Sequence, residues 1–158
     1  METENPIVED LIAPCGMNCA VCSRYLAWRN QTGRSGCIGC RPRNQMCTYL
    51  FEKCTGINHN VPTAEARFCY ECSQYPCKQI ARMDVRYRQN YEMSVKANLE
   101  SLQNFGVARF LDEQYRAFRC EKCGDLISVH NHKCFRCEKV TRLVESRAKR
   151  GQQGEKLG

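Results

Sequence analysis

The clearest pattern of apolar and polar positions lies between Lys78 and Arg119, a stretch with neither cysteine nor proline. Apolar residues recur there at helical spacing in two stripes, and Gly106 separates them. A glycine directly after an apolar stripe suits the left-handed residue that ends a helix. The pattern therefore predicts a helical hairpin or a kinked pair of helices. The first stripe comprises Val95, Leu99, Leu102 and Phe105, and the second comprises Val107, Phe110, Leu111 and Phe118, with the polar Gln114 at the same helical spacing.

A shorter helix is predicted around Ala20 to Asn30. Val21, Tyr25 and Trp28 can line one face of it, and a glycine follows its end. The rest of the chain between Ala13 and Cys77 is interrupted by glycine, proline and asparagine. We therefore expect this zone to be irregular and to depend on something other than regular secondary structure.

Cysteine content changes the picture most, because 14 of the 158 residues are cysteines, about nine per cent. A chain of this length, if divided into two small domains, cannot rely on an apolar core alone. Five pairs have CxxC spacing, which lets two thiolates from one tight turn reach one ion and which a disulfide framework does not explain. The pairs are Cys19/Cys22, Cys37/Cys40, Cys69/Cys72, Cys120/Cys123 and Cys134/Cys137.

The expected compartment agrees with metal binding. The segment from Met1 to Asp10 carries four acidic residues and no basic one, so it lacks the positive and apolar regions of a signal peptide. We expect a cytoplasmic protein, in which thiols stay reduced and available for metal.

The sharpest signal is CEKCGDLISVHNHKCFRC, in which two CxxC pairs are separated by ten residues. This spacing predicts a zinc ribbon whose four thiolates fill a tetrahedron and leave no open position, so the zinc is structural. Leu126, Ile127 and Val129 are expected to form a strand of the hairpin. With four sulfurs available, His130 and His132 are expected to be hydrogen-bonded or exposed and not to be ligands. The predicted ligands are Cys120, Cys123, Cys134 and Cys137.

The ten cysteines of the N-terminal zone are also predicted metal ligands, but spacing leaves their grouping open. One grouping places Cys19, Cys22, Cys37 and Cys40 in one site and Cys47, Cys54, Cys69 and Cys72 in another, with Cys15 and Cys77 unassigned. An interleaved grouping, such as Cys15, Cys19, Cys22 and Cys77 together, is equally compatible with the sequence.

The metal in this zone is open as well. The string CGMNCAVC has the CxxxCxxC spacing by which radical S-adenosylmethionine enzymes hold three irons of a cluster. Those enzymes place the string in a barrel of about 200 residues or more, and this chain shows no matching alternation of strands and helices. A plain iron–sulfur cluster is the stronger alternative to zinc, because such clusters accept varied cysteine spacings.

The formal charge of +7 suggests a polyanionic partner, but this count treats every cysteine as neutral. Twelve thiolates holding three zinc ions would reduce the charge to +1, which removes most of the argument for nucleic-acid binding. Tyr87 and Tyr91 alternate with arginines on the predicted helix, yet a solvated helix face is the commoner explanation. A protein partner is the other interpretation. No apolar run approaches the ~20 residues of a membrane span.

Catalysis has no visible apparatus in the sequence. A nucleophilic cysteine needs an adjacent base, and His59 is the only histidine in the cysteine-rich zone. No phosphate-binding glycine loop or carboxylate pair is present either. A non-enzymatic role is therefore the favoured interpretation.

Several motifs together carry a family resemblance: LIAPCGMNCAVCSRYLA, CIGCRPRNQMC, FCYECSQYPCKQI and the closing pair of CxxC turns. Over roughly Leu11 to Cys137 the chain resembles a family of cysteine-rich bacterial and archaeal proteins, many from anaerobes, defined as a domain of unknown function. The resemblance implies metal binding and no particular activity. It places the family's recurrent cysteines at Cys15, Cys19, Cys22, Cys37, Cys40, Cys69, Cys72 and Cys77. Between Cys47 and Cys54 the chain departs from the family pattern.

The sequence as a whole predicts a small, metal-organised α+β protein in four parts. These are a cysteine-rich module at 11–77, a helical connector at 78–119, a zinc ribbon at 120–137 and a basic, disordered tail at 138–158. The predicted function is zinc binding, with about three ions, in an interaction or adaptor module. The alternative is an iron–sulfur redox or sensor protein with one cluster in the N-terminal module in addition to zinc.

Overall fold

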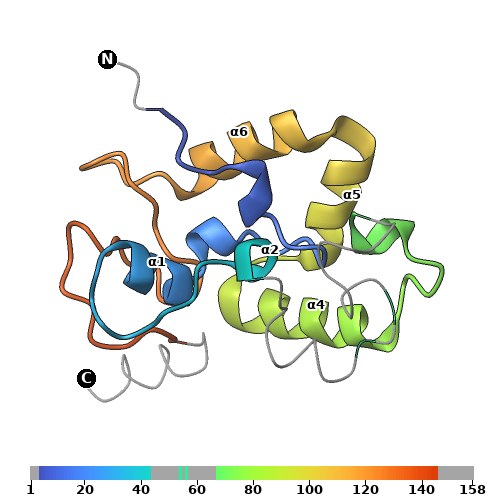
Figure 1. Cartoon of the computed structure of the whole chain (residues 1–158), viewed down its shortest axis with the longest axis horizontal. Coiled ribbons are helices and arrows are strands. Elements are labelled where there is room, and N and C mark those ends of the chain that lie inside the picture. The colour runs from blue at the N-terminus through green and yellow to red at the C-terminus, as the bar shows by residue number, and fades with distance from the viewer. Residues whose placement is uncertain (1–3, 44–53, 55, 57–66, 146–158) are drawn as a thin grey trace.

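The computed structural model describes residues 4–43, 54, 56 and 67–145, and its regular structure is helical (Figure 1). The α-helices are α1 (Ser23–Arg29), α2 (Cys40–Arg43), α4 (Lys78–Tyr91), α5 (Val95–Phe105) and α6 (Val107–Phe118). In the same described residues, three 3-10 turns precede or separate these helices: η1 (Glu9–Leu11), η2 (Cys19–Val21) and η4 (Cys69–Glu71).

β-Structure in the described residues is limited to three isolated bridges. They pair Ile12 with Asn18, Arg119 with Leu126 and Ile127 with Cys134. The prediction of an α+β fold is therefore confirmed only in part: the helices are present, whereas the expected strand at Leu126 to Val129 is reduced to bridging residues. None of the helices in the described part of the chain has the length and apolar character needed to cross a bilayer.

The interior is built around an irregular segment. Every residue from Leu11 to Val21 is buried, although only its ends are in 3-10 turns. Figure 1 shows this blue segment running through the centre of the molecule, with α5 and α6 on one side and α4 on the other. Asn98 of α5 donates to the Gly16 carbonyl at 2.9 Å, and the Asn18 side chain donates to Gln114 of α6 at 3.2 Å. Side chains of the helices thus satisfy polar groups that burial would otherwise leave unpaired.

The region between Lys78 and Arg119 contains three helices and not the two predicted. The unpredicted break follows Tyr91, where Glu92 adopts a left-handed conformation with φ 56°. The buried carboxylate of Asp84 in α4 accepts from the Ser94 hydroxyl at 2.6 Å and from the Lys96 N–H at 3.1 Å. Asp84 therefore ties α4 to the first turn of α5 and holds the break in place.

Hydrogen bonding also sets the charge state of Asp84. Burial alone would raise its pKa, but the Ser94 hydroxyl, the Lys96 N–H and the Arg88 guanidinium together hold the pKa below its usual value. The carboxylate consequently stays ionised inside the helical region.

The predicted apolar stripes are largely correct. Val95, Leu99 and Leu102 are fully buried, and Phe110 is the buried anchor of α6. Phe105 does not continue the first stripe, because 55% of its surface is exposed at the end of α5. Gly106 has the expected positive φ of 86°, yet its ψ of 168° is not left-handed helical, since this residue also starts α6.

Helix α1 lies within the predicted range of Ala20 to Asn30 but turns a different face inward. Leu26 and Ala27 are buried in α1, whereas Trp28 is 43% exposed and Tyr25 is only half-buried. Val21 is buried as predicted, but it belongs to η2 and not to the helix.

The C-terminal segment, orange to red in Figure 1, lies against α1. Val129 donates to the Val21 carbonyl at 2.9 Å, and Arg29 forms a 2.9 Å ion pair with the buried Asp125. Contacts with the rest of the protein continue past 137: Leu143 packs on the core and the Glu145 N–H donates to the His130 carbonyl at 2.8 Å. Residues 146–158 lie outside the described part of the chain.

Gly16 is the position where a side chain is least tolerable. Its φ is +85°, and a Cβ there would lie 2.9 Å from the Val95 carbonyl oxygen and 2.8 Å from Leu99 Cγ. Gly33 has a similar φ of +74°, but a Cβ there meets nothing within 4 Å. We expect Gly16→Ala to lower the free energy of unfolding by about 2 kcal/mol more than Gly33→Ala, because only the first adds a clash with α5 to the backbone strain. Urea unfolding of both variants measures the difference, and equal losses would contradict the close packing.

Candidate metal centre

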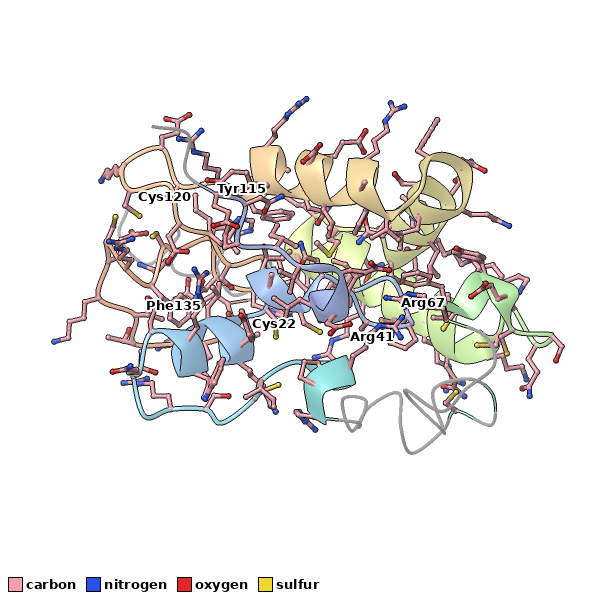
Figure 2. All side chains as sticks on the ribbon, turned by 45° about the horizontal axis from the view of Figure 1, so that its top comes forward. Cys22, Arg41, Arg67, Tyr115, Cys120 and Phe135 are labelled. Carbon is pink, nitrogen blue, oxygen red and sulfur yellow. The ribbon has the colours of Figure 1, made fainter. Side chains whose placement is uncertain are left out.

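Four cysteines meet at the end of the chain that follows α6. The Sγ atoms of Cys120, Cys123, Cys134 and Cys137 all lie within 4.8 Å of one another. Cys120 and Cys137 are separated by 4.0 Å between sulfurs, and Cys123 and Cys134 by 3.6 Å. Figure 2 shows Cys120 toward one end of the molecule, beyond Tyr115 of α6. The two CxxC turns predicted to share one site are thus brought together.

Each turn presents its first cysteine to backbone donors. The N–H groups of Cys123 and Lys122 donate to Cys120 and lower its pKa to about 7, against a burial effect in the other direction. In the turn from Cys134 to Cys137, the N–H groups of Cys137 and Arg136 donate to Cys134. Hydrogen bonds of this kind stabilise a thiolate, and they arise directly from the CxxC backbone.

Two other thiols of the site, those of Cys134 and Cys137, retain protons when no metal is bound. A hydrogen bond with the Cys123 side chain is the main cause that raises the pKa of Cys137 to about 12, and burial is the main cause that raises the pKa of Cys134. Four such groups cannot all carry negative charge at this separation without a cation between them. Metal uptake must therefore release protons, which makes affinity pH-dependent.

Contacts with the rest of the protein position the site. The Tyr115 hydroxyl of α6 donates to the Gly124 carbonyl at 3.1 Å, just after the first turn. On the side of α1, the hydroxyls of Ser23 and Ser128 are 2.6 Å apart. The four-cysteine site is thus anchored between α6 and α1 and is not an independent appendage.

The two histidines between the CxxC turns are not among the four ligands. His130 is buried, and its Nδ1 accepts from the Ser23 N–H at 3.2 Å while its Nε2 lies 2.9 Å from the Tyr87 hydroxyl. Because Nδ1 accepts, the neutral ring carries its proton on Nε2 and donates to Tyr87. His132 is exposed. Both outcomes agree with the prediction of hydrogen-bonded or exposed histidines.

Five N-terminal cysteines line a second feature, a cavity of about 390 Å³. Cys15, Cys19, Cys22, Cys37 and Cys40 contribute to its wall, so the structure brings one predicted group of four to a single place and adds Cys15 to it. Cys77, the fourth member of the interleaved grouping, does not line this cavity.

The remaining described cysteines lie around another CxxC turn of the N-terminal zone, formed by Cys69 and Cys72, which we call the second CxxC turn. Cys54 Sγ accepts from the Gly56 N–H at 3.4 Å, and a Cβ on Gly56 would lie 2.8 Å from Cys72 Sγ, so Cys54 and Cys72 flank the same glycine. Cys77 is the residue that directly precedes α4. Cys47 and His59 lie outside the described residues.

Tyr87 and Tyr91 also differ from their sequence interpretation. Tyr91 is buried, and both rings pack edge-on against His130, with centroid distances of 5.6 Å and 4.9 Å. The two tyrosines belong to the wall of the five-cysteine cavity and not to a solvated face. The spacing of residues along α4 could not reveal this packing, because His130 lies some 40 positions farther along the chain.

Comparison with known protein families supports the resemblance seen in the sequence. Residues 11–82 match the family model described as protein of unknown function, DUF3795. The DUF3795 segment holds the five cavity cysteines and the second CxxC turn, and its match ends inside α4. The four-cysteine site at 120–137 therefore lies outside the matched region, although the motif resemblance seen in the sequence extended to Cys137. Searches of curated proteins and of solved structures found no significant match.

Proposed function

We propose that the protein binds zinc at the four-cysteine site and that this zinc is structural. One observation supports the proposal most directly: the sulfur separations of 3.6 and 4.0 Å. Four sulfurs placed ~2.3 Å from a central zinc in a tetrahedron are ~3.8 Å apart, so the thiols already surround a position that zinc would fit. The donor set and the backbone N–H groups at Cys120 and Cys134 also suit a zinc ribbon.

A structural role follows from the number of ligands. Four sulfurs complete the tetrahedral coordination that zinc adopts in structural sites, so no position remains for water or substrate. The site would hold the C-terminal segment against α1 and α6 and give the protein a rigid surface. This arrangement favours an interaction or adaptor module over an enzyme.

Zinc content tests the site directly. Cys123→Ser removes one ligand, and Glu121→Ser places the same side chain at an exposed position of the same turn. We expect Cys123→Ser to lose about one zinc ion per chain and Glu121→Ser to lose none, because only the first breaks the tetrahedron. Elemental analysis of the purified full chains gives the answer. Equal zinc in both variants would refute zinc binding at this site.

Tyr87 and Tyr91 pack on His130, and this packing supports a partner other than a nucleic acid. We propose a protein partner instead. Salt-dependent binding to DNA or RNA would count against this choice.

A second candidate function is that of an iron–sulfur redox or sensor protein. The specific observation in its favour is the cavity lined by five cysteines.

A further inference from the structure

The cysteines of the five-cysteine cavity line an open volume and do not converge on a single point. Cys15, Cys19 and Cys40 are buried, and Cys22 and Cys37 are half-buried at its wall. Within the described residues, however, the C-terminal site is the only place where three or more potential metal-ligand atoms lie within 4.8 Å of one another. The cavity sulfurs therefore do not stand at the separation that a single tetrahedral zinc requires.

A polynuclear group fits this arrangement better than one ion. In a four-iron cluster each cysteine binds a different iron atom, and inorganic sulfide lies between the irons, so the cysteine sulfurs stand farther apart than around one metal ion. A cavity of about 390 Å³ has room for a polyatomic group. The three thiols of the CxxxCxxC string and the two of the next CxxC pair approach it from two segments of the chain.

The charges at the wall are those that an anionic cluster needs. Among the described residues, Arg24, Arg43 and Arg86 line the cavity and no carboxylate does. Arg43 Nη1 donates to Cys37 Sγ at 3.2 Å. A cluster held by four thiolates carries net negative charge, and hydrogen bonds to sulfur stabilise it further. Hard cations such as Mg²⁺ and Ca²⁺ require oxygen ligands, and no carboxylate of the described residues lines this wall to supply them.

We propose that this cavity binds an iron–sulfur cluster, using the thiol of Cys22 and three of the four other thiols at its wall, those of Cys15, Cys19, Cys37 and Cys40. The inference deepens the second candidate function and shares no ligand with the zinc site. The second CxxC turn at Cys69 and Cys72 is excluded as a ligand pair, since neither residue lines the cavity.

The chain offers a closely matched control. Cys22 ends η2 with φ −74° and ψ 133°, and Cys72 ends η4 with φ −74° and ψ 135°. Both cysteines are half-buried, and the N–H of each donates to the carbonyl of the cysteine three residues earlier. Only Cys22 lines the cavity; Figure 2 shows it near the middle of the molecule, by α1.

The test uses the full chain purified without oxygen and, where iron is low, reconstituted with ferrous iron and sulfide. We expect iron and acid-labile sulfide in equal amounts, with broad visible absorption, besides the zinc of the C-terminal site. Cys22→Ser should reduce iron and sulfide at least about fivefold, whereas Cys72→Ser should leave both within about 20% of the parent. Neither variant removes a ligand of the C-terminal site, so that zinc, followed through the Cys123→Ser comparison, reports on the zinc proposal separately.

Arg43→Gln provides a second readout, because it keeps every thiol and removes a positive charge and a donor to Cys37. We expect the cluster to form in this variant with a lower reduction potential, since lost positive charge and a lost hydrogen bond to sulfur disfavour the reduced state. This measurement stays informative if Cys22→Ser does not fold. The proposal fails if the reconstituted chain holds zinc and no iron, if Cys72→Ser loses as much iron as Cys22→Ser, or if Arg43→Gln leaves the potential unchanged.

Discussion

Removal of zinc from the four-cysteine site is expected to unfold residues 119–145 while α4, α5 and α6 stay folded. The C-terminal segment has only two isolated bridges of its own and few large buried side chains. Zinc in comparable small sites contributes ~10 to 16 kcal/mol at neutral pH, which exceeds what these contacts can supply. The helices keep an apolar interior of their own, which includes Leu99 and Phe110.

Hydrogen exchange followed by segment measures this effect. Backbone amides such as those of Ile127 and Ser128, which donate to Phe118 and Lys133, should lose protection on chelation, and amides within α5 should keep it. A chelator would also remove metal from any other site, so Cys123→Ser is the cleaner comparison. Restored protection on addition of zinc to the parent chain, and not to Cys123→Ser, completes the control. Full protection of Ile127 in zinc-free protein would show that metal does not hold this segment.

Loss of zinc has a second consequence through His130. This residue lies between the two CxxC turns and also lines the five-cysteine cavity. When the C-terminal segment unfolds, one wall of the cavity opens to water. We therefore expect Cys123→Ser to make the contents of the cavity more sensitive to oxygen and chelators, although the variant alters no thiol there.

Local patterns carried the successful predictions. The residues of the C-terminal site follow from CxxC spacing, because each turn is set by four consecutive residues and by N–H groups within it. The apolar stripe at Val95, Leu99 and Leu102 is likewise a local helical property, and the structure buries all three residues.

Long-range hydrogen bonds explain where local patterns failed. The strand expected at Leu126 to Val129 is reduced to the bridging residues Leu126 and Ile127, and the Val129 N–H bonds instead to Val21 in a distant segment. The break after Tyr91 had no glycine or proline signal, and it is held by Asp84, whose carboxylate accepts from Ser94 and Lys96.

The structure of the N-terminal module could not be predicted from the sequence for a different reason. An irregular segment that is buried on all sides, as Leu11 to Val21 is, has no periodic alternation of apolar and polar residues to detect. Grouping of the cysteines is equally hidden, since Cys22 and Cys72 have the same local backbone and yet only one lines the cavity. Only the tertiary arrangement distinguishes the two CxxC turns.

Protonation of His130 is expected to destabilise the protein as pH falls. Burial, followed by the positive charges of Arg86 and Arg24, lowers the pKa of His130 from 6.5 to about 4. Protonation would also turn Nδ1 from the acceptor of the Ser23 N–H into a donor, so that hydrogen bond would be lost.

The sign follows from the lowered pKa. Between pH 6.5 and pH 4 the unfolded chain binds a proton at this histidine and the folded chain does not, so the free energy of unfolding decreases as pH falls through this range. The full contribution is present above pH 6.5 and amounts to about 3 kcal/mol, most of which is lost near pH 4.

Urea unfolding between pH 4.5 and 7 tests this expectation. The zinc thiolates also take up protons in acid, so two substitutions are used to distinguish the contribution of His130 from theirs. His130→Gln should reduce the pH dependence by up to one proton. His132→Gln, at an exposed histidine two residues away, should leave it unchanged. A pH dependence that is the same in the parent and in His130→Gln would mean that the buried imidazole does not resist protonation, and that the thiolates alone account for acid lability.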